Sequence, residues 1–459
     1  MTTAPVTRRH FCSAAALAAA PTAPPNLILF YVDELRATAL RLHNPDGVPT
    51  PNLERLARGG ILFEHAFTPH PLCVPARVSL WSGRHSHAHG SRSNQTFLRD
   101  DQTCLAGLLH RAGYRLGIFG KNHCFTPPQL QRWFDADYTL DSARWKQALP
   151  PEVAAQVRAH RQWIRERGGA MMPPEAAPFP PEICETHLIN QRAMEFIEQS
   201  RGGPFAAWIS IPDPHHPIQT PQPFAAAVPP EKVKLPPFLA GEMRSKNTRH
   251  QIYDYLIRGA ELPEDFLRRF LSIYYGMVAF IDHELGRLMA LLERTGLLRN
   301  TILLFTSDHG DFAAEHHLII KTGSLLDSMV RIPLVLSWPG RLPEGRRERA
   351  LVSHVDLMPT LLELCSLAVP SGPDGQRLPL RPGDPRRSYV YSEYGAGGPE
   401  FTWEEAKALG QAGRLGDYAL RTPAEQQALR KREWAGHLRM IRTATHKLIL
   451  DSNGEREFY

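Results

Sequence analysis

The chain contains 459 residues, of which 42% are hydrophobic and 22% are charged, and its formal net charge is +6. These values are typical of a globular protein with a large buried core and exclude an intrinsically disordered or fibrous chain. The sequence has no run of about 18 apolar residues, so we expect no membrane-spanning segment. It also lacks a basic stripe interleaved with aromatic residues, so we expect no nucleic-acid partner.

Residues 1–25 resemble a twin-arginine export signal. Arg8 and Arg9 stand before Phe11 and a short alanine-rich stretch, which is the order of charged and apolar regions in such leaders. A disordered basic tail is the alternative interpretation. We expect this segment to direct the protein to the periplasm or out of the cell.

The first elements after the leader alternate between strand and helix. Residues 26–34 form an apolar run that ends in two acids, which predicts a buried parallel strand. The segment 51–58 predicts a helix with one apolar face, which ends at Gly59 and is followed by a strand. A second helix and a strand over residues 114–119 repeat this order.

Later segments continue the same pattern. Residues 204–211 and 301–307 are apolar runs of strand length, and residues 266–294 have the periodicity of a long helix. Strands that alternate with helices predict an α/β fold, with a large mixed, mostly parallel sheet flanked by helices. In such sheets the ligand site lies at the carboxyl ends of the strands.

We expect the chain to divide into a catalytic domain over residues 26–370 and a smaller subdomain over residues 371–459. Within the first, residues 141–185 and 217–265 are rich in proline and charge and predict loops or short helices over the site. The C-terminal part predicts an antiparallel sheet, with a helical stretch near 403–435.

Five cysteines lie outside the leader. This odd number leaves at least one of them unpaired or chemically special, and without CxxC pairs they do not predict a zinc site. Taken alone, Cys73 fits a packed thiol, half of a disulfide, a metal ligand, a nucleophile or the precursor of another group. The five are Cys73, Cys104, Cys124, Cys184 and Cys365.

Acidic residues follow two of the predicted strands. Asp33 and Glu34 end one strand, and Asp308 and His309 end another. Carboxylates at strand ends predict one divalent cation, with calcium favoured, and the imidazole also admits manganese or zinc beside magnesium. The alternative is that these acids cap helices or pair with arginines, but two such pairs at strand ends favour the metal.

Basic residues and histidines gather at the same expected edge of the sheet. Lys121 and His123 end one strand, His215 and His216 follow another, and Lys321 lies beyond a third. A single residue of these types usually lies on the surface. Several of them beside a metal are typical of a site for a tetrahedral oxyanion ester.

The segment 83–90 carries three alternating histidines, His85, His87 and His89. On a strand they would share one face and suggest a second metal, but the segment follows a glycine in a predicted loop. We favour a role beside the substrate or on the surface, and we assign His89 and Asn94 to substrate binding.

Six motifs occur in order along the chain: PNLILFYVDELR, PNLERLARGGILFEHAF, LCVPARVSLWSGR, GYRLGIFGKNH, PDPHHP and NTILLFTSDHGD. Together they resemble the motifs of the sulfatases of the alkaline-phosphatase superfamily. The resemblance extends from residue 26 to about residue 364 and is weaker beyond. It implies an alkaline-phosphatase-like fold and hydrolysis of a sulfate ester of a small molecule or a carbohydrate.

In that family the cysteine of a C-x-P-x-R motif is oxidised after translation to formylglycine, and Cys73, Pro75 and Arg77 match the motif. The resemblance therefore implies that a formylglycine-generating enzyme acts on this chain and that Arg77 orients the product. One hydroxyl of the hydrated aldehyde attacks sulfur to form a covalent sulfate ester, and the other releases it. A helix expected to start at Cys73 would direct its N-terminal amides at the anion.

The resemblance also implies a role for each remaining residue that matches. Lys121 and Lys321 would bind sulfate oxygens. His123 would take the proton in the release step, and His215 would protonate the leaving alcohol, with His216 as the alternative acid and a substrate contact. The implied metal ligands are Asp33, Glu34, Asp308 and His309.

Three residues depart from the family pattern. Ala76 replaces a serine common in the cysteine motif, and Glu34 has a longer reach than the usual residue, which weakens the argument for direct ligation. His309 stands where many sulfatases have asparagine, and relatives that hydrolyse phosphonate monoesters or phosphodiesters also have histidine there. Such a hydrolase is one alternative function, and an inactive protein that binds a sulfated ligand is another.

Overall fold

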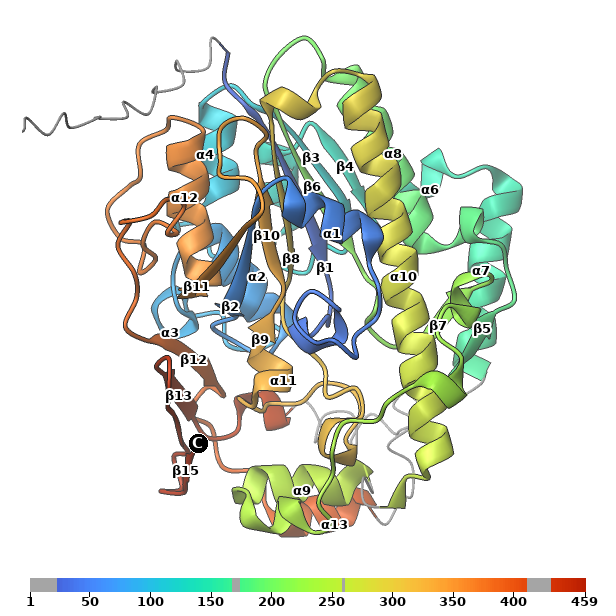
Figure 1. Ribbon diagram of the computed structural model, residues 1–459, viewed down its shortest axis with the longest axis vertical. Coiled ribbons are helices and arrows are strands. Elements are labelled where there is room, and N and C mark those ends of the chain that lie inside the picture. Colours follow the sequence, from blue (N-terminus) through green and yellow to red (C-terminus); the bar gives the residue numbers. More distant parts are fainter. Residues whose placement is uncertain (1–22, 167–173, 258–260, 411–430) are drawn as a thin grey trace, which may run out of the picture.

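A nine-stranded sheet forms the centre of the molecule, with helices on both faces and a separate four-stranded sheet at the C-terminal end (Figure 1). Almost all of the expected export leader lies outside the described residues, as does most of the helical stretch expected near 403–435. None of the described helices combines the length and the apolar character that a membrane span requires. This computed structural model describes residues 23–166, 174–257, 261–410 and 431–459.

The strands of the large sheet follow the order β11-β2-β10-β8-β1-β6-β3-β4, and β9 pairs with β2 outside this row. Most neighbours are parallel, whereas β10 runs antiparallel to both β2 and β8. This confirms the expected mixed, mostly parallel sheet. Its strands are β1 (Asn26–Val32), β2 (Ile61–Phe67), β3 (Arg115–Gly120), β4 (Ala136–Thr139), β6 (Phe205–Ile211), β8 (Thr301–Ser307), β9 (Arg331–Ile332), β10 (Leu334–Ser337) and β11 (Arg346–Ser353).

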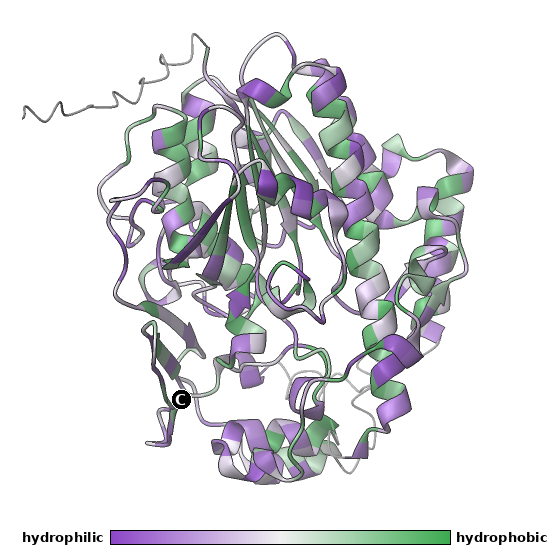
Figure 2. Cartoon of the chain, in the orientation of Figure 1, coloured by the Kyte–Doolittle hydropathy of each residue, from purple (hydrophilic) through white to green (hydrophobic). Residues whose placement is uncertain are grey.

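Strand β1 is buried on both faces because its side chains alternate between two hydrophobic cores. Ile28 and Phe30 belong to one core, and Leu27 and Leu29 belong to the other. Figure 2 accordingly shows the central strands as largely hydrophobic. A strand covered on both sides has no polar face, which explains why this part of the sequence is an unbroken apolar run.

Different helices cover the two faces of the sheet (Figure 1). The core that contains Phe30 packs against α1 (Pro51–Arg58), α8 (Glu185–Gln199) and α10 (Glu264–Arg294). The opposite core packs against α2 (Cys73–Ser82), α4 (Leu105–Arg111), α5 (Pro127–Trp133) and α12 (Leu357–Leu364).

The two expected insertions contain more regular structure than short loops. Their strands β5 and β7 pair in parallel beside α10. The longest of their helices, α7, exceeds the short helices that we expected. The elements are α6 (Ala143–Ala148), α7 (Pro151–Glu166), β5 (Glu175–Ala177), β7 (Gln219–Pro221) and α9 (Thr248–Ile257).

The C-terminal strands form the expected antiparallel sheet, in the order β12-β13-β14-β15. A hydrogen bond from Glu393 N to Pro69 O, 2.9 Å long, joins this sheet to the rest of the molecule. The division of the chain at residue 370 stays a prediction. The remaining elements are α3 (Ser86–His89), α11 (Asp327–Val330), β12 (Val390–Tyr394), α13 (Trp403–Gly410), β13 (Leu438–Arg442), β14 (Lys447–Leu450) and β15 (Arg456–Phe458).

Candidate active site

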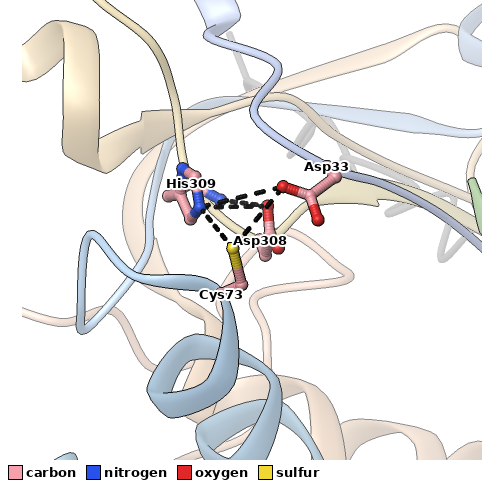
Figure 3. A group of neighbouring side chains, drawn as sticks. All are labelled: Asp33, Cys73, Asp308 and His309. Atoms are coloured by element: carbon pink, nitrogen blue, oxygen red, sulfur yellow. Dashed lines mark hydrogen bonds and ion pairs between the residues drawn. The ribbon is translucent and has the colours of Figure 1, made fainter. Parts of the chain in front are cut away.

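The candidate active site lies at the carboxyl ends of β1 and β8. These strands are parallel neighbours with Val32 opposite Ser307, so Asp33 and Asp308, which follow them, come side by side. The first residue of α2, Cys73, points toward both carboxylates and toward His309 (Figure 3). The topology therefore brings together four residues that the sequence separates by up to 276 positions.

The Cys73 thiol is surrounded by basic groups. Its Sγ lies 3.2 Å from Lys321 Nζ, 3.6 Å from Lys121 Nζ and 3.3 Å from His309 Nε2. Burial and the nearby Asp33 carboxylate would raise the pKa of the thiol, but the two lysines and His309 lower it well below its ordinary value. A group with negative charge is therefore stabilised at this position.

The guanidinium of Arg77 holds the two strand-end carboxylates together. It donates to Asp33 Oδ2 at 2.9 Å and to Asp308 Oδ2 at 3.1 Å, and to Ser210 Oγ at 2.7 Å. Arg77 lies one turn after Cys73 on α2 and is completely buried. The C-x-P-x-R spacing thus directs the cysteine and the arginine to the same cluster.

Four side chains offer donor atoms to a cation. One ligand atom from each of Asp33, Cys73, Asp308 and His309 lies within 4.8 Å of the others, and all four residues are buried. Burial, and then repulsion from Asp33, raises the pKa of Asp308. Two buried carboxylates and an imidazole are a donor set that fits a divalent cation.

Glu34 belongs to a neighbouring group rather than to this cluster. Its Oε2 accepts a hydrogen bond from Lys321 Nζ at 3.2 Å and lies 3.4 Å from His215 Nε2 and 3.7 Å from His216 Nδ1. The backbone of Glu34 is left-handed, with a φ of 69°, so its side chain points in a different direction from that of Asp33. Burial raises the pKa of Glu34, and Asp311 adds to that effect.

Burial lowers the pKa of both histidines after β6, which disfavours their charged forms. Burial, and then the neighbouring His216 and Lys321, lower the pKa of His215 well below its ordinary value. His215 Nδ1 donates to the carbonyl oxygen of His216 at 2.6 Å, so Nε2 is the atom that can exchange a proton. His123 lies two residues after Lys121, in the loop that follows β3. Burial and Lys121 lower its pKa, and its interaction with Cys73 opposes them.

The family described as Sulfatase matches residues 25–367. The chain belongs to the sulfatase family.

Relatives and solved structures agree with this membership. The chain is 26% identical to an arylsulfatase of Clostridium perfringens (strain 13 / Type A), over 77% of each protein. It is 26% identical to an N-acetylglucosamine-6-O-sulfatase of Bacteroides thetaiotaomicron, over 82% of this chain and 75% of that protein. The fold is similar to that of a phosphonate monoester hydrolase of Agrobacterium radiobacter, with a TM-score of 0.75, 23% identity, and coverage of 95% and 89%.

The residues assigned to the substrate of this sulfatase lie in different places. Asn94 is next to Cys73, because its Oδ1 accepts a hydrogen bond from Val74 N at 3.2 Å. His89 is buried, with its Nε2 2.9 Å from Ser79 Oγ of α2. The structure thus brings Asn94 beside Cys73 and directs His89 into the protein. His87 and His89 lie on the short helix α3, and His85 directly precedes it, so the three histidines do not share a strand.

Sequence reasoning missed three residues around the site. Ser210 on β6 binds Arg77, and Asp311 contributes to the pKa of Glu34. Glu433 Oε2 accepts a hydrogen bond from Asn94 N at 2.8 Å, although it comes from the C-terminal part of the chain. Only Asp311 had a detectable signal, since it follows the Asp308–His309 pair at the same strand end.

The five cysteines outside the leader are all free. This agrees with the prediction that at least one is unpaired, and it removes the disulfide interpretation of Cys73. Burial raises the pKa of Cys124, Cys104 and Cys365, in contrast to Cys73. The basic surroundings are therefore specific to the cysteine of the motif.

Proposed function

We propose that this sulfatase hydrolyses a sulfate ester at a formylglycine derived from Cys73, with the help of one divalent cation. The observation that carries the proposal is the meeting of Lys121, Lys321 and the Asp33–Asp308–His309 donors at Cys73 Sγ, at the first turn of α2. Cationic groups on several sides of one atom suit a tetrahedral anion bound there.

The two lysines would bind sulfate oxygens. Both ammonium groups lie within 3.6 Å of Cys73 Sγ, on different sides of it, since Lys121 pairs with Asp33 and Lys321 pairs with Glu34. Each carboxylate keeps its lysine extended toward the reaction centre. Positive charge fixed in a buried site stabilises the charge that develops on the sulfate oxygens as the S–O bond breaks.

Asp33, Asp308 and His309 would hold the cation, for which calcium is our first choice because most donors are oxygens. A cation held there would supply Lewis-acid chemistry to the ester and the nucleophile. Glu34 would not be a ligand in this arrangement, because it faces Lys321 and the histidines. Its contribution is to position Lys321, through Nζ and also through the backbone N at 3.0 Å.

Formylglycine would supply a hydroxyl that attacks sulfur and a second hydroxyl whose deprotonation releases the product. Arg77 would hold this group against the metal ligands through Asp33 and Asp308. His123 would accept a proton in the release step. His215 lines the cavity beside the reaction centre, and its protonated form would give the Nε2 proton to the leaving alcohol.

A second candidate function is hydrolysis of a phosphonate monoester or a phosphodiester. The specific observation that favours it is His309, which places an imidazole among the proposed cation donors where many sulfatases have an amide. Its Nε2 lies 3.7 Å from Asp308 Oδ1. The reacting sulfur and phosphorus atoms are both tetrahedral, so the shape of the site does not distinguish the two kinds of ester. Rates measured on matched esters decide between the two functions. We also propose that residues 1–25 direct export of the protein and that a formylglycine-generating enzyme converts Cys73.

The test is mass spectrometry of the Cys73 peptide, with sulfate release measured on the same protein. We expect an aldehyde at Cys73 when the protein is made together with the maturation enzyme, and loss of activity in Cys73→Ala. Cys365→Ala, which changes another buried cysteine, serves as the control and keeps activity. Unmodified thiol in fully active protein would refute the aldehyde mechanism. Faster turnover of a phenyl phosphonate than of phenyl sulfate would favour the second function.

A further inference from the structure

A large cavity opens beside the reaction centre. It has a volume of about 910 Å³ and begins at Lys121, His123 and His215, the residues that would face the ester oxygen. From there it continues to α7, in the first of the two insertions. Cavities of about 300–1,000 Å³ hold drug-sized ligands, so this one has room for much more than the reacting group.

The walls of the cavity are largely apolar. They come from the sheet side and α10 as well as from the insertion, so the cavity is closed by elements far apart in the sequence. Apolar side chains on these walls give binding energy to an apolar part of a ligand. The main apolar residues are Phe97, Phe125, Leu130, Val157, Ile164 and Phe280.

The charged residues away from the reaction centre are mostly acidic. Asp137, Asp141 and Glu185 line the cavity, and the one arginine among its described lining residues is Arg161. Arg161 is already paired with Glu185, with its Nη2 2.6 Å from Oε1. A second anionic group on the substrate would therefore meet the carboxylates of Asp137 and Asp141 without a free cation to pair with.

We propose that the cavity receives the alcohol part of the ester and selects an uncharged, largely apolar alcohol, rather than an oligosaccharide that carries several sulfates. Helix α7 would be the specificity-determining element, because Val157 and Ile164 form the wall on that side. This inference rests on the proposed function, since the alcohol must leave from an ester held at Cys73.

The first test compares two esters that differ by one charge, 2-naphthyl sulfate and 6-sulfonato-2-naphthyl sulfate. We expect kcat/KM of the matured enzyme to be at least about tenfold lower for the sulfonated ester. Asp141→Lys should reduce this difference severalfold, because it replaces an acidic lining residue with a basic one. Equal rates for the two esters, or faster turnover of the sulfonated one, would overturn the inference.

The second test fills the cavity. Val157→Trp should raise KM for 2-naphthyl sulfate about tenfold or more, whereas Ala155→Trp, at an exposed position of the same helix that does not line the cavity, should leave it unchanged. An unchanged KM in Val157→Trp would contradict the role of α7.

Binding of 2-naphthol to Cys73→Ala protein, followed by calorimetry, separates the two proposals because it needs no catalysis. If Cys73→Ala protein binds 2-naphthol and the binding disappears when Val157→Trp is added, the cavity inference is supported. If the matured enzyme then hydrolyses no sulfate ester, only the proposed function is refuted. Absence of naphthol binding together with active sulfate hydrolysis would refute the cavity inference alone.

Discussion

Arg77 is the residue on which the geometry of the site depends most. Its guanidinium binds both strand-end carboxylates and Ser210, and it packs on the rings of Tyr31 and Trp208 at 5.1 and 5.7 Å. Burial would lower its pKa, but Asp308 and Asp33 raise it above the ordinary value. The charge is therefore permanent, and the planar fork fixes the distance between the two acids.

Replacing Arg77 tests this role without any substrate. Arg77→Met removes the guanidinium that the two buried carboxylates share and leaves only Asp33 with a lysine partner, so we expect the free energy of unfolding of metal-free protein to fall by about 3–5 kcal/mol. Urea denaturation followed by circular dichroism measures it. Arg99→Met, which breaks an exposed pair with Asp101, should cost less than about 1 kcal/mol. A loss of unfolding free energy for Arg77→Met as small as that of the control would show that the ion pairs of Arg77 with Asp33 and Asp308 contribute little to stability.

At the scale of elements, the sequence predicts features that follow from local periodicity, but not features that depend on which strands pair and in which direction. The apolar run of β1 and the acids after it are local features, so their place at the sheet edge was predictable. The antiparallel direction of β10 was not, because a four-residue apolar strand has the same pattern in either direction. Likewise, the burial of His89 depends on the short helix α3, and the alternate spacing of the histidines in the sequence does not predict this helix.

The cavity could not be predicted either, because it depends on tertiary packing. Helix α7, which forms one wall, has apolar residues at helical spacing, but nothing local shows that Val157 lines the same cavity as Phe280 of α10. The motif residues differ in this respect. Cys73, Lys121 and Asp308 each follow a recognisable strand or start a helix, so their meeting follows from the topology alone.

The carboxylate of Glu393 connects strand β12 to α3. It accepts from Ser86 Oγ and His87 N, and it faces His87, Arg92, His437 and Tyr391. Burial alone would raise the pKa of Glu393, but the hydrogen bonds and the histidines lower it from 4.5 to about 2. The C-terminal sheet is thus attached to the segment before Asn94 through a buried carboxylate.

Because the folded pKa of Glu393 is depressed, its stabilising effect is present above about pH 4.5 and is lost as the pH falls toward 2. We expect Glu393→Gln to lower the free energy of unfolding by about 2–3 kcal/mol at pH 6. The difference from wild type should shrink between pH 4.5 and 3, as measured by urea denaturation across this range. Glu152→Gln, at an exposed position of α7, is the control. A difference independent of pH would contradict this assignment.

At the scale of the whole molecule, the proposed cation site joins two parts of the chain that are far apart in the sequence. Asp33 follows β1, whereas Asp308 and His309 follow β8. A cation bound by all of them stabilises the folded state only, because the unfolded chain does not keep these donors together.

Metal removal therefore has a thermodynamic readout. Adding calcium to chelator-treated protein should raise the melting temperature, by the equivalent of about 2.7 kcal/mol at a free concentration 100 times Kd. Asp308→Asn should abolish most of this increase, whereas Asp101→Asn on the surface should not change it. Differential scanning calorimetry measures both. An equal increase for Asp308→Asn and wild type would show that calcium binds elsewhere.

The burial of helix α2 has a consequence for the order of events in biosynthesis. Every residue from Cys73 to Ser82 is buried, and Cys73 is only 1% exposed. An enzyme that converts this cysteine must reach it before the helix packs between the sheet and α12. The proposed modification is therefore a step of the nascent or unfolded chain, and a molecule that folds first with its thiol intact would be trapped in an immature form.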